Sequence, residues 1–139
     1  MTRFLGIDYG GKRIGLSVSD PAATLASPLA TIVAGSDAGA DIRALLARTD
    51  GYDIDEFVVG LPLNMDDSEG DQARVAKRFG DELARVTGKP VHLWDERLST
   101  HAAAELLRPA GLTRKKRKKS LDSVAAAVLL QAFLDARGP

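Results

Sequence analysis

The strongest constraint on the fold is a pair of short apolar segments that only a glycine turn separates. Phe4–Ile7 is an apolar run, and after Gly10-Gly11 apolar residues alternate with polar or small ones through residues 13–19. Alternation with a period of two is typical of a half-buried strand, so the two segments predict an antiparallel pair. A third strand is expected over Ala26–Val33, at an edge of the sheet because Pro28 lacks the N–H that a central strand needs.

Beyond this meander, helical and strand patterns alternate. The expected elements are a helix over Asp41–Arg48, a strand over Phe57–Val59, a long amphipathic helix whose start is rich in acidic residues (66, 67, 69 and 71) and which ends at Gly88-Lys89-Pro90, a strand over Val91–Trp94, a helix from Ser99 or Thr100 to about Arg108, and a last helix with an apolar stripe from Leu121 to Phe133. The order β-β-β-α-β-α-β-α-α contains no repeat and no long linker. It predicts one α/β domain over residues 1–139, with a mixed five-stranded β-sheet flanked by α-helices.

Composition restricts the chemistry that is open to the chain. There is no cysteine and there are two histidines, which excludes thiolate catalysis and cysteine-ligated metal and argues against a histidine-rich zinc site. A bound metal should therefore be a hard cation held by oxygens. The longest apolar run, Val124–Leu130, is too short to span a bilayer, and Asp8 interrupts the segment in which a secretion signal would be apolar.

Charge is distributed unevenly along a chain whose net charge is zero. Six of the 19 basic residues lie in the run 114–119, so that 13 basic residues face 19 acidic ones elsewhere, a balance of −6. An acidic body with one basic segment indicates a protein that meets a polyanion at one place. The residues expected to contact phosphates are Arg114, Lys115, Lys116, Arg117, Lys118 and Lys119. The alternative is a solvated loop that binds nothing in particular.

Acidic residues stand at the ends of three predicted elements. Asp8 ends the first strand, Asp95 and Glu96 follow the fifth, and Asp122 lies near the start of the last helix. Each position also has an ordinary structural explanation: an acid can open a glycine turn, be neutralised by the arginine that follows, or join Ser120 in capping a helix. Because neighbouring strand residues point to opposite faces, only one of Asp95 and Glu96 should face a common site.

Taken together, the three positions indicate a metal site. Converging carboxylates repel one another unless divalent cations lie between them, and carboxylate oxygens suit Mg²⁺ or Mn²⁺. Two such ions about 3.5–4 Å apart can activate a water and stabilise the leaving oxygen in phosphodiester hydrolysis. The basic segment would then hold the nucleic-acid backbone.

Four segments carry a resemblance to a known family. They are Leu5-Gly6-Ile7-Asp8-Tyr9-Gly10-Gly11-Lys12-Arg13-Ile14-Gly15 with Ser19-Asp20, Val59-Gly60-Leu61-Pro62-Leu63-Asn64, Asp95-Glu96-Arg97-Leu98-Ser99-Thr100, and Leu121-Asp122-Ser123-Val124-Ala125-Ala126. In this order, and over essentially the whole chain, they closely resemble the YqgF (RuvX) family of bacterial pre-16S rRNA nucleases, long described as Holliday-junction-resolvase-like.

The resemblance implies an RNase H-like fold and a cytoplasmic, metal-dependent endonuclease that processes the 5′ end of pre-16S rRNA in ribosome biogenesis, with Mg²⁺ or Mn²⁺, expected as two ions. The implied catalytic residues, which are also the metal ligands, are Asp8, Glu96 and Asp122. Arg13, Asn64 and Arg97 are expected to join the basic segment in binding nucleic acid. One departure is Asp67, where the family's loop usually has glycine.

Other function classes remain as alternatives. Sugar kinases and Hsp70-like ATPases open with a similar Gly-Ile-Asp-x-Gly segment, but they need a second domain that 139 residues cannot supply. A nucleic-acid-binding module without catalysis stays open, because the sequence does not show that the acids converge. Within the nuclease class, the substrate is either precursor rRNA, with the ribosome as a further partner, or branched DNA. The sequence does not separate the two, because rRNA processing and the resolution of Holliday junctions in DNA recombination and repair use the same chemistry.

Overall fold

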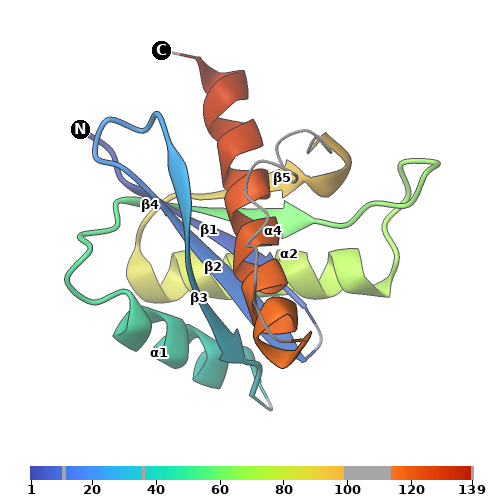
Figure 1. Cartoon of the computed structure of the whole chain (residues 1–139). Coiled ribbons are helices and arrows are strands. Elements are labelled where there is room, and N and C mark those ends of the chain that lie inside the picture. Colours follow the sequence, from blue (N-terminus) through green and yellow to red (C-terminus); the bar gives the residue numbers. More distant parts are fainter. Residues whose placement is uncertain (11, 36, 99–113, 139) are drawn as a thin grey trace.

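A mixed five-stranded sheet forms the centre of the computed structural model, which describes residues 1–10, 12–35, 37–98 and 114–138, those at 114–120 by their backbone only (Figure 1). The strands are β1 (Phe4–Tyr9), β2 (Arg13–Ser19), β3 (Ala26–Val33), β4 (Glu56–Leu61) and β5 (Val91–Asp95), and the helical elements are α1 (Ala38–Arg48), α2 (Asp71–Thr87), the short 3₁₀ turn η1 (Glu96–Leu98) and α4 (Arg114–Arg137). The α/β architecture and all five strands expected from the sequence are confirmed.

The strand order is β3-β2-β1-β4-β5, with the meander β1–β3 antiparallel and β1, β4 and β5 parallel. Pro28 lies on the edge strand β3, as its missing N–H requires, and the β2–β3 register shifts between Leu16 and Ser17, opposite this part of β3. Because β1 lies in the middle, its carboxyl end has one neighbour from the meander and one from the parallel half of the sheet.

Alternate residues of the central strands face two different helical layers. On one face, Ile7 and Val59 pack with Leu45 of α1 and Phe79 of α2, whereas on the other Phe4 and Val58 pack with residues of α4. Figure 1 shows α4 crossing the second face, whereas residues of α1 and α2 pack on the first. Small residues let α4 approach closely: a Cβ at Gly6 would lie 2.8 Å from the Cβ of Leu130, and Ser17 Oγ donates to the carbonyl of Ala126 at 2.7 Å.

Three details differ from the sequence expectation or lie beyond what the structure describes. The last helix begins at Arg114 rather than near Ser120, since lysine and arginine are good helix formers and continue the helix toward the N-terminus. The acidic residues 66, 67 and 69 belong to the loop before α2, which begins at Asp71. The helix expected from Ser99 or Thr100 to Arg108 falls outside the described residues. Within the described ranges, no helix is long and apolar enough to cross a membrane.

Candidate active site

The three predicted carboxylates lie at the same end of the sheet, on the face that α4 covers. Asp8 is near the carboxyl end of β1, Glu96 opens η1 directly after β5, and Asp122 lies on α4 above β2. Asp8 occupies the central position, because its register partner on β2 is Gly15 while Glu96 approaches from the opposite side of β1. Glu96 is 88 residues from Asp8 in the chain and 26 residues from Asp122, yet all three lie at one end of the sheet.

Glu96 reaches Asp8 across an intervening strand. β4 lies between β5 and β1, so the side chain of Glu96 must pass over β4, and it does so at Gly60. A Cβ at position 60 would overlap the Glu96 carboxylate and lie 2.9 Å from its Cγ. Since carbon atoms in contact are normally about 3.5–4.0 Å apart, only glycine leaves room for this crossing.

Asp8 and Glu96 share a hydrogen bond in partly buried surroundings. Burial is the main cause that raises the pKa of Asp8, and the charge of Asp122 raises it further, while the hydrogen bond from Glu96 opposes the shift. For Glu96, burial followed by the charge of Asp8 raises the pKa to about 7. In the absence of a cation, the two carboxyl groups therefore share a proton, with Glu96 as the donor, up to about pH 7.

Asp122 approaches the pair from the other side and is held by an arginine. Its backbone carbonyl lies directly over Gly15, where a Cβ would overlap it, and its Oδ2 accepts a hydrogen bond from Arg13 Nε at 2.5 Å. Arg13 belongs to β2, so the ion pair ties α4 to the strand beside Asp8. As the structure stands, Asp122 is neutralised by Arg13 rather than hydrogen-bonded to the other two acids.

The donor chemistry fits a divalent cation, although the three acids are not gathered into a closed cage. Among the residues that the structure describes, no three acidic or histidine side chains are close enough together to hold a metal ion as they stand. Two carboxylates in contact, with raised pKa values, nevertheless form a set of oxygen donors of the kind that Mg²⁺ and Mn²⁺ prefer. Asp8 and Glu96 could hold such an ion, and Asp122 is a further carboxylate whose charge acts on Asp8.

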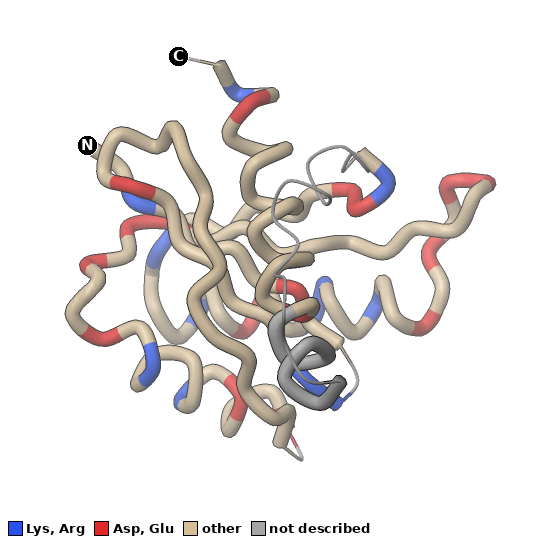
Figure 2. The backbone as a smooth tube through the Cα atoms, in the orientation of Figure 1, with Lys and Arg blue, Asp and Glu red and all other residues tan. Residues whose placement is uncertain are grey.

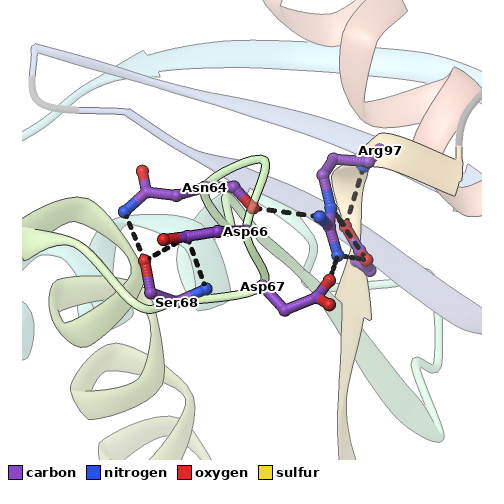
Figure 3. Close-up of polar contacts among 6 residues, drawn as sticks. Asn64, Asp66, Asp67, Ser68 and Arg97 are labelled. Carbon is purple, nitrogen blue, oxygen red and sulfur yellow. Dashed lines mark hydrogen bonds and ion pairs between the residues drawn. The ribbon is translucent and has the colours of Figure 1, made fainter.

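The guanidinium of Arg97, the residue after Glu96, forms its hydrogen bonds with other residues of the protein (Figure 3). Its guanidinium binds Asp95, donates through Nη2 to Asp67 Oδ1 at 2.7 Å and donates through Nη1 to the carbonyl of Asn64 at 2.9 Å. The arginine lowers the pKa of Asp95, mainly through these hydrogen bonds. Asp95 is therefore the acid that Arg97 neutralises, while its neighbour Glu96 turns toward Asp8.

The loop between β4 and α2 is folded by its own polar residues. Asn64 Nδ2 donates to Ser68 Oγ at 3.0 Å, Asp66 accepts from the backbone and hydroxyl of Ser68, and the Asp67 N–H donates to the Asn64 carbonyl (Figure 3). Asp67 has φ 69°, a left-handed conformation that favours glycine, and its side chain compensates by pairing with Arg97. Figure 2 shows this loop as an acidic projection beside the end of the sheet.

Arg114–Lys119 form the first turns of α4 instead of a separate loop. The N-terminal turn of a helix carries a partial positive charge, and six cationic residues lie in these first turns. Such an end is unfavourable in isolation and attracts anions. The backbone of the predicted phosphate-binding segment is therefore continuous with the helix that carries Asp122.

Sequence reasoning missed the residues that give the acids their room and their support. Gly15 and Gly60 lie on the strands at either side of β1, under Asp122 and Glu96 respectively. Tyr9 donates from its hydroxyl to Asp41 of α1. Gly60 and Gly15 could have been singled out as glycines within strand patterns, a signal for close approach by another group.

Two solved structures that share this fold are resolvases. Over 99% of this chain and 97% of the other, the fold matches "T. thermophilus RuvC in complex with Holliday junction substrate", with a TM-score of 0.60 and 16% identity. It also matches the Holliday junction resolvase of fowlpox virus, with a TM-score of 0.61 and 11% identity over 98% of this chain and 99% of that chain. These likenesses show that the chain belongs to the class of proteins with an RNase H-like fold.

Sequence comparison gives the family within that class. The family model described as "RuvX: Holliday junction resolvase" matches residues 2–136. Two relatives are named "Putative pre-16S rRNA nuclease". The relative from Anaeromyxobacter sp. (strain Fw109-5) is 46% identical, and the match covers 97% of this chain and 98% of the relative. The relative from Geobacillus kaustophilus (strain HTA426) is 43% identical, and the match covers 97% of this chain and 99% of the relative. The chain belongs to the RuvX family and is a nuclease, a hydrolase of phosphodiester bonds. This assignment favours a nuclease over the alternative of a module without catalysis.

Proposed function

We propose that this chain is a Mg²⁺- or Mn²⁺-dependent endonuclease, working as one domain in the bacterial cytoplasm, that processes the 5′ end of pre-16S rRNA. The observation that carries the metal-dependent mechanism is the contact between Asp8 and Glu96, which join across β4 and both have raised pKa values. The names of relatives at 43–46% identity favour precursor rRNA as the substrate over a DNA junction.

The acid pair is costly unless something compensates its charge. Ionising two partly buried carboxylates side by side is unfavourable, which raises the pKa of Glu96 to about 7, so a divalent ion would take the place of the proton that Glu96 donates. When bound, Mg²⁺ or Mn²⁺ would activate a water molecule and stabilise the negative charge on the phosphate oxygens. We propose that two such ions bind. Asp8 and Glu96 would hold the metal, with Asp122 as the third ligand.

Phosphate binding is assigned to cationic groups around the acids. The first turns of α4, residues 114–119, combine six positive charges with the positive end of a helix. Arg13 balances Asp122 beside the site, and Asn64 lies in the loop next to the carboxyl end of β5. Arg97 is proposed to reach a phosphate by exchanging it for Asp67, the more exposed of its two carboxylate partners.

The test compares two substrates with and without metal. A precursor 16S fragment that contains the mature 5′ end and a four-way DNA junction are incubated with Mn²⁺, with Mg²⁺ and with EDTA. We expect metal-dependent cleavage of the RNA, abolished by Asp8→Asn, which keeps the shape of the side chain but not its charge. Asp81→Asn, on the exposed side of α2, is the matched control and should retain full activity.

Two results would contradict the proposal in different ways. Cleavage of the junction but not of the RNA would identify the protein as a resolvase. Undiminished cleavage by Asp8→Asn, or full activity in EDTA, would show that the acid pair is not a metal site.

A further inference from the structure

At the end of β1 that presents Asp8, the described pairing extends further with β2 than with β4. Asp8 and Tyr9 pair with Gly15 and Ile14 of β2, whereas the described register with β4 ends one residue earlier, at Ile7 and Val59. Near this last described pair, Glu96 reaches over β4 at Gly60 to Asp8. A restraint from outside the strand ladder would therefore help to fix the orientation of Asp8.

Tyr9 provides such a restraint from the opposite face of the sheet. Neighbouring strand residues point to opposite faces, so Tyr9 faces α1 and α2 while Asp8 faces α4. The Tyr9 ring stacks on Phe79 of α2 with 4.1 Å between centroids and 19° between planes. Its hydroxyl donates to Asp41 Oδ2 of α1 at 2.7 Å.

Asp41 is well placed to hold the tyrosine. It is 2% exposed, and its Oδ1 accepts a hydrogen bond from the backbone N–H of Gly35 at 2.5 Å. Within the described part of the chain, no lysine or arginine forms an ion pair with it, so its hydrogen bonds compensate the cost of burial. An apolar pair would fill this space at lower cost, but it would not give Tyr9 a fixed direction.

We infer that Tyr9 and Asp41 are positioning residues for the nuclease reaction, which fix the carboxylate of Asp8 through the one peptide unit between Asp8 and Tyr9. A rotation of the strand end moves both side chains together, so a clamp on one face restricts the other. This inference rests on the proposed function, since it needs Asp8 to be a metal ligand. Residues that orient metal ligands typically change metal affinity or activity 10–100-fold when they are replaced.

The experiment measures Mn²⁺ binding and catalysis in matched variants. Tyr9→Phe removes the hydroxyl and keeps the stacked ring, and Asp41→Asn keeps the shape of its partner. Thr49→Val is the control, because it removes another buried hydroxyl hydrogen bond of α1, from Thr49 Oγ1 to the carbonyl of Leu45, away from the acids. Calorimetric titration with Mn²⁺ is combined with kcat and KM on the precursor RNA and with thermal unfolding.

For Tyr9→Phe and Asp41→Asn we expect about a tenfold loss in both Mn²⁺ affinity and kcat, with KM for the RNA unchanged. Thr49→Val should lose a similar amount of thermal stability and none of the Mn²⁺ affinity. If Tyr9→Phe behaves like Thr49→Val in every readout, Tyr9 is only a core residue and the inference is wrong. Asp8→Asn separates the two levels: if it still binds Mn²⁺ normally, the proposed function fails, and the role inferred for Tyr9 fails with it.

Discussion

Substitution of Gly60 by alanine places a Cβ against the side chain of Glu96, at the point where that side chain crosses β4. The new carbon would lie 2.9 Å from Cγ and 3.1 Å from Cδ of Glu96, and would overlap its carboxylate. Restoring ordinary carbon contacts of about 3.5–4.0 Å requires the side chain to move by roughly 0.5–1 Å. That movement separates Glu96 from Asp8, and a misplacement of about 1 Å at a reacting centre can lower the rate about 100-fold.

Stability should change much less than activity in this variant. Glu96 is partly exposed and can turn toward solvent, so overpacking should lower the free energy of unfolding by only about 1 kcal/mol. Alanine is more favourable than glycine in a strand by roughly 0.5–1 kcal/mol, which offsets most of this cost. Cleavage kinetics and thermal unfolding would be measured together. Gly80→Ala is the control: its Cβ would lie 3.3 Å from a methyl of Leu93, on the face away from the acids. If Gly60→Ala cleaves within threefold of the parent rate, the crossing of Glu96 over β4 is not the productive geometry.

Two further predictions concern pH and salt. In EDTA the free energy of unfolding should fall by about 1–2 kcal/mol as pH rises from 4.5 to 7. The pKa of Glu96 is about 7 in the folded state and 4.5 ordinarily, so the native state binds more protons than the unfolded state in this window. Because Glu96 is partly exposed, the expected loss is smaller than the full pKa shift would give. Urea unfolding at several pH values should show a flatter profile for Glu96→Gln, and parallel profiles would contradict the assignment. Replacement of Lys115, Lys116, Lys118 and Lys119 by glutamine should weaken RNA binding and lower the slope of log affinity against log salt by up to about 3, at about 0.7 per single-strand contact, with little change in Tm. An unchanged slope would show that these lysines do not contact phosphate.

The fold was predictable because its signals are local. The alternation in β2, the glycine turn before it and Pro28 in β3 each act over a few residues, and each identifies a strand or an edge without knowledge of the rest of the chain. The positions of the acids were predictable for the same reason, since each stands at the end of an element. That Asp8 and Glu96 lie at the same sheet end follows from the parallel arrangement of β1, β4 and β5.

The supporting contacts were not predictable, because they depend on the strand order and on packing across the fold. Gly60 matters because β4 lies between β5 and β1, an arrangement that local patterns do not give. Tyr9 and Asp41 are 32 residues apart, and Arg97 binds Asp67 30 residues away. The occupation of Arg97 by two carboxylates could be foreseen only in part, from the acid that precedes it by two residues.

The early start of α4 changes how substrate binding and catalysis can be connected. A lysine- and arginine-rich run was compatible with a solvated loop, but these residues also have high helix propensity, and the helix extends through them to Arg114. At about 1.5 Å per residue, Lys119 and Arg114 lie roughly 5 and 12 Å along the axis from Asp122. This distance spans only a few phosphates of a nucleic-acid strand. Because Asp122 is fixed over Gly15 and paired with Arg13, a phosphate bound at the first turns of α4 would be held at a set distance from the acids. If the segment binds phosphate and Asp122 is the third ligand, as proposed, their place on one helix would let binding at the segment position the strand for cleavage, which two separately mobile loops would not do.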